Sequence, residues 1–251
     1  GIEIDIDKGL PIGSGIGSSA ASAVAAAVAA DALLDARLSA EEILECSVEG
    51  EKIASGAVHV DNLAPSFYGG FILVRGYNPI DVVRIKPPES LWCTIIYPHI
   101  EIMTIEARKL LPQAVPLRDL ITQTGNAAGL VAGLLTGDLA LIGRSLNDVV
   151  AEPARAHLIP GFHDMKRAAL SAGALGCSIS GAGPSLFALS ASTKTAQAVG
   201  EAMSNVLRLI GCRHSHLVSA ICKTGARLTM PGSLDETNAP MDASSHIRSV
   251  A

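Results

Sequence analysis

The sequence predicts an α+β protein in which helices and strands interleave without a clean repeat of β-α-β units. The chain has 251 residues, and 49% of them are hydrophobic, which is enough for one large or two modest domains with their own cores. Apolar residues recur at helical spacing in some segments and alternate or run together in others. Because these patterns follow one another irregularly, we favour the α+β class over a doubly wound sheet.

The N-terminal segment is predicted to form a strand, a glycine loop and two helices. Isoleucines alternate with polar residues over 2–6, which is typical of a strand. Alternate glycines then lead into an alanine-rich helix over 19–34, since alanine has the highest helix propensity. Ser39 and Glu42 have the spacing of a capping box, which predicts a second helix from 40 to about 54.

The remaining elements follow from the same patterns and from turns marked by Gly and Pro. Glycines and prolines are expected to interrupt the chain over 56–70. In chain order we then expect strands over 71–76, 82–85 and 91–98; helices over 104–111, 117–135, 138–150 and 161–172; strands over 177–180 and 185–190; a helix over 194–210; and two closing strands.

Consecutive prolines at 87 and 88 mark the best candidate for a domain boundary. We therefore predict one domain over residues 1–86 and a second over residues 87–230. Beyond Met230 the composition turns to Pro, Ser, Asn and Asp, so residues 231–251 are expected to form a disordered tail.

Composition and charge exclude several classes of protein. With 19 basic and 24 acidic residues and no block of Lys and Arg, the chain is not expected to bind nucleic acid. The most apolar segment, residues 20–30, falls well short of the about 20 residues that a bilayer requires, so no membrane span is expected. Five cysteines without Cys-x-x-Cys spacing indicate reduced thiols and a cytoplasmic protein. The chain opens on a strand pattern with no initiator Met, so we expect its natural start to lie upstream.

The glycine loop is the first candidate functional site. Glycine lets a ligand approach the main chain, and the start of a helix has unpaired N–H groups and a positive dipole end that favour a phosphate. The loop does not fit the Walker pattern, because Gly17 is followed by Ser18 and Ser19 without a lysine, nor the dinucleotide pattern, which needs glycine in place of Ser18. Taken alone, the loop is either a phosphate site or a tight structural turn.

Two glycine-containing motifs resemble those of the GHMP small-molecule kinases. The segment "PIGSGIGSSAAS" (11–22) resembles their phosphate loop, with Ile16 in place of the usual leucine, and "CSISGAGPSLFAL" (177–189) resembles their third motif. Within this superfamily, the chain is similar to the homoserine kinases over about residues 1–228. The segments that carry this similarity are "EGEKIASGAVHVDNLAPSFYGGF" (49–71), "MTIEARKLLP" (103–112) and "AEPARAHLIPGF" (151–162).

The resemblance implies a fold and an activity. The fold would combine an ATP-binding N-terminal domain like ribosomal protein S5, incomplete in this chain, with a ferredoxin-like C-terminal domain and an active site between them. The activity would be transfer of the γ-phosphate of ATP to the hydroxyl of L-homoserine, a step toward threonine, by a homodimer of the cytoplasm or, in a plant, of the plastid stroma. The family also carries a first motif on strands before the start of this chain, so we expect activity to require residues outside it.

By the same resemblance, the ATP phosphates would lie on the main chain of the glycine loop, beside the turn of the third motif. Mg²⁺, which prefers oxygen ligands, would be held by Ser19 and Glu51. Without the resemblance, Glu51 would be expected on a solvated helix face beside Glu49 and Lys52. The implied phosphate-binding residues are Pro11, Gly13, Ser14, Gly15, Ile16, Gly17, Ser18, Ser19, Gly181 and Gly183.

Homoserine offers a carboxylate, an ammonium group and the reacting hydroxyl. Arginine pairs with carboxylates through two parallel hydrogen bonds, and the resemblance assigns Arg108 and Arg155 to the substrate. Thr104 would share the helix face of Arg108 and add a hydroxyl contact. Without the resemblance, both arginines would be expected on helix surfaces. The resemblance also assigns His59 and Asn62 to homoserine.

The sequence does not identify a general base. If residues 59–62 are extended, alternation places His59 and Asp61 on one side and Asn62 on the other. Asp61 lies near the position of the aspartate base of mevalonate kinases, but its spacing differs, so we assign it no role. In a loose transition state the attacking hydroxyl keeps its proton until late, so Ser19, Glu51 and Asn62 can act through positioning and electrostatics.

Two alternatives remain open. One is a sister GHMP kinase that acts on mevalonate or another small alcohol, which the implied substrate residues disfavour. The other is a catalytically inactive homologue that binds a nucleotide, which the missing first motif favours.

Overall fold

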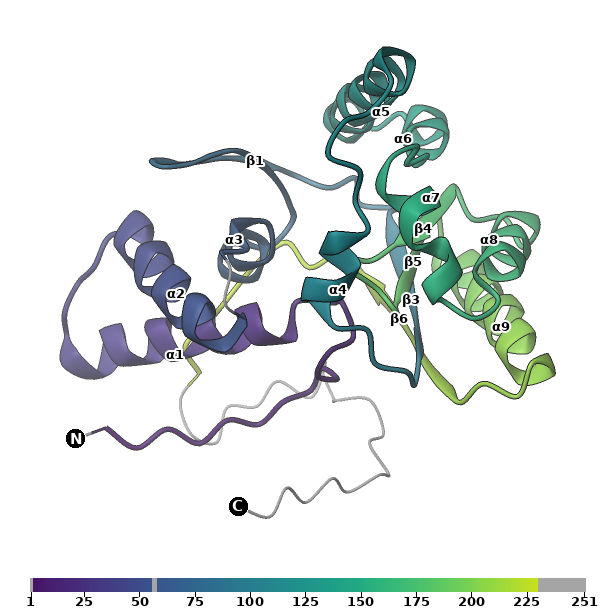
Figure 1. The fold of residues 1–251 in the computed structure, drawn as a ribbon. Helices are drawn as coiled ribbons and strands as arrows, with labels where there is room; N and C mark the ends of the chain where they lie inside the picture. The colour runs from purple at the N-terminus through teal and green to yellow at the C-terminus, as the bar shows by residue number, and fades with distance from the viewer. Residues whose placement is uncertain (1, 56–57, 230–251) are drawn as a thin grey trace.

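The computed structural model describes residues 2–55 and 58–229 of the chain. The tail predicted at 231–251 lies outside these described residues. Helices and strands interleave irregularly along the chain, and both sheets are antiparallel, which confirms the α+β class (Figure 1). Within the described ranges, no helix has both the length and the apolar character needed to cross a membrane.

A layer of helices forms the N-terminal part of the structure. It consists of α1 (Ser18–Leu34), α2 (Ala40–Ser55) and α3 (Val60–Tyr68). Small alanines on α1 let its neighbours pack closely, and the buried core of the layer includes Ala20, Val24, Leu44 and Leu63. The helices predicted over 19–34 and 40–54 are confirmed to within one residue.

The capping box predicted at the start of α2 is present. The main-chain N–H of Ser39 donates to Glu42 Oε2 over 2.7 Å, and the N–H of Glu42 donates to Ser39 Oγ over 3.2 Å. These hydrogen bonds hold the pKa of the Glu42 carboxyl below its usual value. The start of α2 is therefore determined by its own sequence.

A two-stranded hairpin follows α3 and consists of β1 (Phe71–Tyr77) and β2 (Ile80–Ile85). The segment after the last strand returns to this part of the molecule. There, the N–H of Gly70 donates to Cys222 O over 2.7 Å, and the N–H of Ala226 donates to Ser66 O over 3.0 Å. Residues 222–226 thus pack against α3 and the start of β1, while the domain boundary at residue 87 stays a prediction.

A four-stranded antiparallel sheet with the order β4-β5-β3-β6 organises the rest of the chain. Its strands are β3 (Trp92–Pro98), β4 (Gly176–Ile179), β5 (Leu186–Ser190) and β6 (His214–Ala220). Side chains alternate between its two faces, so Leu186 and Ala188 lie in one core while Phe187 and Leu189 lie in another. The sheet is therefore buried on both sides.

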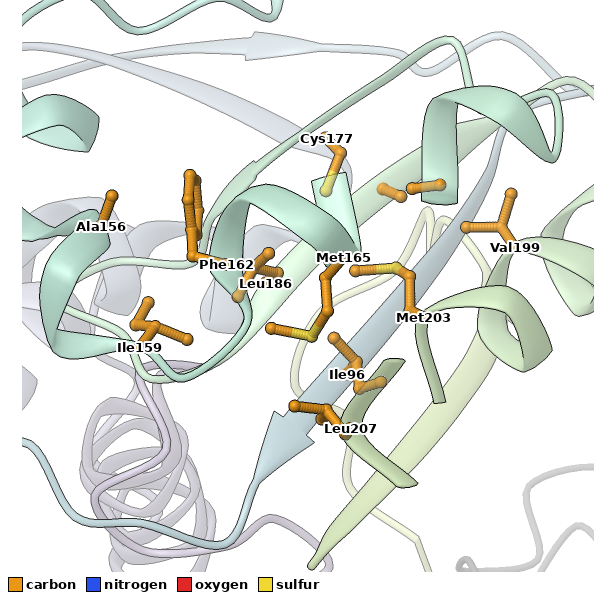
Figure 2. Packing of buried hydrophobic residues seen from close by; sticks show 12 residues of the cluster. Ile96, Ala156, Ile159, Phe162, Met165, Cys177, Leu186, Val199, Met203 and Leu207 are labelled. Carbon is orange, nitrogen blue, oxygen red and sulfur yellow. The ribbon is translucent and has the colours of Figure 1, made fainter. Parts of the chain in front are cut away.

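Helices α8 (Phe162–Ser171) and α9 (Thr193–Leu209) cover one face of this sheet. Figure 2 shows how Met165 and Met203, from the two helices, meet Ile96 and Leu186 of the strands. Helices α5 (Leu117–Thr136) and α6 (Leu139–Ser145) contribute Leu134 and Ile142 to the second core.

Three short helical segments complete the structure: α4 (Thr104–Lys109), α7 (Ala151–Arg155) and the 3₁₀ turn η1 (Ala156–Leu158). Figure 1 shows α4 between the N-terminal helices and the four-stranded sheet, and α7 beside β4. Most of the predicted substrate residues lie on α4 and α7.

Some predicted elements are wrong. Residues 2–6 form no strand, and Ile2, Ile4 and Ile6 are about half exposed, because none of the described strands pairs with this segment. Of the two closing strands, only β6 is present among the described residues, because the segment beyond it bonds to Ser66 of α3 and to Gly70 instead of extending a sheet.

The helix assignments between 56 and 158 also differ from the prediction. Helix α3 forms despite Pro65, because Val60, Leu63 and Ala64 bury one face completely, and this burial outweighs the missing hydrogen bond. The helix predicted over 138–150 ends at Ser145. Helix α7 then begins where the carboxylate of Asp148 accepts hydrogen bonds from main-chain N–H groups, a local signal that helical periodicity does not reveal.

Candidate active site

The glycine loop has left-handed backbone angles that favour glycine. Gly13, Gly15 and Gly17 have φ angles of 69°, 79° and 78°, which side-chain-bearing residues rarely adopt. A Cβ on Gly15 would lie 2.5 Å from the carbonyl oxygen of Gly183 and 2.6 Å from that of Ser180. Gly15 is therefore required both for its backbone angles and for close contact with another segment.

That contacting segment is the turn of the second glycine motif. Ser180 Oγ donates to Gly15 O over 2.9 Å, and the N–H of Ser185 donates to Ser14 O over 3.2 Å. A Cβ on Gly181 would lie 2.9 Å from Gly15 O. The prediction that the two glycine motifs lie side by side is thus confirmed, although 165 positions separate Ser180 from Gly15.

Helix α1 begins directly after the loop. Its N-cap residue, Gly17, has no side chain to cap the first turn, and Ser18 Oγ donates back to Leu10 O over 3.2 Å. The first turn also contains no acidic residue. The N–H groups and the positive dipole end at this helix start can therefore face an anion.

Lys8, which the sequence did not single out, also lies next to the glycine loop. Its Nζ donates to Ser18 Oγ over 3.4 Å, so its ammonium group lies at the start of α1. The sequence does show a lysine near the loop: none follows Gly17 directly, but Lys8 stands shortly before the first glycine. A positive charge thus lies beside the loop, although the Walker pattern is absent.

Ser19 and Glu51 meet at the same end of α1. Ser19 Oγ donates to Glu51 Oε1 over 3.0 Å, and Glu51 is only 1% exposed. The alternative of a solvated helix face is wrong for Glu51, whereas Glu49 and Lys52 do pair on the exposed side of α2. A buried carboxylate that accepts from a hydroxyl offers the hard oxygen donors that fit Mg²⁺.

His59 and Asn62 lie one helical turn apart at the start of α3. His59 Nδ1 is 3.1 Å from Glu51 Oε1, and His59 is 8% exposed. Asn62 Oδ1 would lie 3.5 Å from a Cβ on Gly17, so its amide reaches the glycine loop. His59 and Asp61 would share a side only in an extended segment; the chain is instead helical from Val60, and Asp61 is exposed.

Arg155 joins the two short helices to the glycine turn. Its Nε donates to Ala107 O over 3.0 Å, and its Nη1 donates to Gly181 O over 3.1 Å. Burial lowers the pKa of Arg155, whereas the charge of Asp148 raises it and that of Arg108 lowers it. The alternative of a surface arginine is therefore wrong for Arg155.

Arg108 and Thr104 lie on α4, and both are exposed. Arg108 follows Ala107, whose carbonyl accepts from Arg155, so the two arginines lie at one junction. The structure thus brings the loop, the turn, Glu51, His59, Asn62 and Arg155 into one connected region, with Arg108 and Thr104 at its exposed edge.

Comparisons with known proteins agree with this architecture. The family models of the GHMP kinases N terminal domain and of the GHMP kinases C terminal region match residues 1–70 and 130–209. The chain is 50% identical over 229 residues to a homoserine kinase of Chlorobium phaeobacteroides, and the match covers 90% of this chain and 72% of that protein. It is also 41% identical over 234 residues to the homoserine kinase of Arabidopsis thaliana, covering 91% of this chain and 62% of that protein.

A solved structure also shows the similarity to homoserine kinases. The crystal structure of homoserine kinase from Cytophaga hutchinsonii is 51% identical in sequence and superposes with a TM-score of 0.84, over 86% of this chain and 69% of that chain. Mevalonate kinase of L. major, at 21% identity and a TM-score of 0.65, shares the fold alone. The chain therefore belongs to the homoserine kinase family of the GHMP kinases.

Proposed function

We propose that this chain carries the catalytic site of an ATP-dependent homoserine kinase. The enzyme transfers the γ-phosphate of ATP to the hydroxyl of L-homoserine and releases ADP and O-phospho-L-homoserine, a step in threonine biosynthesis. The observation that carries the proposed site is the hydrogen bond between Ser19 and Glu51. It places a buried carboxylate and a hydroxyl at the start of α1, next to a loop built from glycines.

The ATP phosphates would bind the main-chain N–H groups of the glycine loop and the positive end of α1. Lys8 would neutralise part of their charge, and Gly181 and Gly183 would border the nucleotide on the opposite side. Ser19 and Glu51 would hold Mg²⁺, which, when bound, would shield the phosphate oxygens.

L-Homoserine would lie at the junction between α3, α4 and α7. Arg155 and Arg108 would pair with its carboxylate, because guanidinium groups match that geometry, and Thr104 would add a hydroxyl contact. His59 and Asn62 would face it from α3, with Asn62 near the loop where the γ-phosphate is expected. These residues would hold the acceptor hydroxyl in line with the phosphate.

No general base is part of the proposal. Asp61 is exposed, on a different side of α3 from the buried His59. A hydroxyl that keeps its proton until late in a loose transition state needs correct placement and shielding of charge. Ser19, Glu51 and Asn62 would provide these functions.

An ADP-release assay tests the proposal with L-homoserine, mevalonate and L-serine as acceptors, in the full-length protein. L-Homoserine should be the preferred acceptor. Glu51→Ala should lower kcat by about 10²- to 10³-fold, the range for losing one group that stabilises transition-state charge. Glu49→Ala is the matched control, because Glu49 lies exposed on the same helix, and it should leave kcat nearly unchanged.

Other outcomes would support the alternatives. Preference for mevalonate would support a sister kinase, and ATP binding without turnover of any acceptor would support an inactive homologue.

We further propose a homodimer located in the cytoplasm, or in the plastid stroma of a plant. Light scattering on the full-length protein would test the dimer, and a monomeric mass would contradict it.

A further inference from the structure

We infer that Glu152 and Lys166 are positioning residues for Arg155: they fix helix α7, and so direct the Arg155 guanidinium at the carboxylate of the substrate. The inference rests on the proposed function and extends it to residues outside the site described above. It concerns one partly buried network that connects α7, α8 and β4.

Glu152 is held at both of its carboxylate oxygens. Oε1 forms an ion pair with Lys166 Nζ of α8, and Oε2 accepts from Ser178 Oγ of β4 over 2.8 Å. The side chains of Glu152 and Lys166 are only 12% and 19% exposed. Such a shielded pair is screened less by water than the exposed pairs elsewhere on the surface, and loss of one partner leaves the other charge partly buried.

Glu152 and Arg155 contact two partners that have the same spacing along the chain as they have themselves. The two residues are one helical turn apart on α7, and their partners, Ser178 and Gly181, are equally far apart along the strand and turn. Glu152 therefore attaches α7 to the strand, and Arg155 attaches it to the glycine turn. With both contacts in place, the direction of the Arg155 side chain is determined.

Helix α7 needs this support because it spans only Ala151–Arg155. A helix of one turn is not stable by itself, since nucleation costs more than its few hydrogen bonds return. Asp148 holds its start by accepting from the N–H groups of Val150, Ala151 and Glu152 over 2.8 to 3.1 Å. The ion pair with Lys166 holds the same turn against the body of the protein.

The glycine turn has separate support. Ser180 and Ser185 bind the loop at Gly15 and Ser14 without any contribution from Glu152. Loss of Glu152 should therefore loosen the helix that carries Arg155, whose side chain would keep only its bonds to Ala107 O and Gly181 O, and should leave the proposed ATP site intact. The resulting defect should affect homoserine rather than ATP.

Steady-state kinetics of the full-length protein test this. Glu152→Gln should lower kcat/KM for L-homoserine by about tenfold or more, because small misplacements of a positioning group have effects of up to about 100-fold. The loss should come from KM for homoserine, with KM for ATP nearly unchanged. Ser178→Ala, which removes one hydroxyl, should give a smaller change of the same kind. Asp164→Asn is the matched control, because its exposed pair with Arg167 lies on the same helix as Lys166.

A purely structural role would give a different pattern. If Glu152→Gln lowers kcat or the melting temperature and leaves KM for homoserine unchanged, the inference is wrong. If Glu152→Gln does not fold, Ser178→Ala decides, and an unchanged KM in that variant overturns the inference. A parent protein that does not turn over homoserine would refute the proposed function itself, and with it this extension.

Discussion

Ser19 and Glu51 form a hydrogen bond of 3.0 Å across 32 positions of the sequence, and it joins the first turn of α1 to the end of α2. The pair places a hydroxyl and a carboxylate oxygen side by side at the glycine loop. The same carboxylate oxygen lies 3.1 Å from His59 Nδ1, so the start of α3 is tied to this point as well.

Substitution of Ser19 should weaken the proposed magnesium site. Ser19→Ala should lower activity by about 10- to 100-fold and raise the Mg²⁺ concentration required for half-maximal rate, because the substitution removes an oxygen ligand and a partner of Glu51. Ser22→Ala is the control, since its hydroxyl donates to Ser18 O within the same helix. The assay is a magnesium titration of the rate, and equal behaviour of the two variants would contradict the assignment.

Substitution of Gly15 should destabilise the fold. Gly15→Ala adds a Cβ at a φ of 79° and within 2.6 Å of two carbonyl oxygens, so the free energy of unfolding should fall by about 1–3 kcal/mol. Gly125→Ala is a control that should raise the free energy of unfolding instead of lowering it. Its Cβ would meet nothing within 4 Å on helix α5, and alanine favours a helix by up to about 1 kcal/mol. Urea denaturation of both variants measures the difference, and equal stabilities would contradict this account.

Lys8 should contribute to nucleotide binding. Lys8→Met should raise KM for ATP about tenfold, equivalent to about 1.4 kcal/mol, because it removes a charged partner of the phosphates. KM for homoserine should stay constant. Lys52→Met removes an exposed lysine that pairs with Glu49, and it should change neither constant. An unchanged KM for ATP in the Lys8 variant would show that its ammonium group does not reach the nucleotide.

The cysteines should differ sharply in reactivity. Burial raises the pKa of the Cys93 and Cys177 thiols to about 12, so at pH 8 almost none of either is thiolate, the reactive form. Cys46 and Cys222 are exposed. A thiol reagent at pH 8 should therefore label Cys46 and Cys222 in the native protein and reach Cys93 and Cys177 only after denaturation, as peptide mapping would show. Rapid native labelling of Cys177 would contradict its burial.

Local signals predicted the structure of the glycine loop and of the two helices that follow it. The glycines at 13, 15 and 17 indicate positive φ angles, the alanines indicate a tightly packed helix, and the Ser39–Glu42 pair indicates where the next helix begins. Each of these depends on the residue itself and its near neighbours, so the sequence contains the whole cause. Lys8 was not predicted, because the Walker pattern places its lysine after the glycines and Lys8 stands before them.

The environment of the proposed substrate site could not be predicted in the same way. The sequence left open whether residues 59–62 are extended. Burial of Val60, Leu63 and Ala64 makes the segment helical, which separates Asp61 from His59. Whether Glu51 is solvated or buried, and whether Arg155 lies on the surface, also depends on partners far along the chain. Residues 2–6 have a strand pattern but pair with none of the described strands.

By itself, the sequence determined the α+β class, the glycine loop with its helix, and the family to which the chain belongs. Only the tertiary structure decided that Glu51 is buried against Ser19, that Asn62 reaches the loop, and that Arg155 joins Ala107 to Gly181. The physical reason is the distance along the chain over which each kind of interaction acts. Backbone preference and capping act within a few residues, whereas burial and the pairing of buried polar groups depend on contacts that exist only once distant segments have packed together.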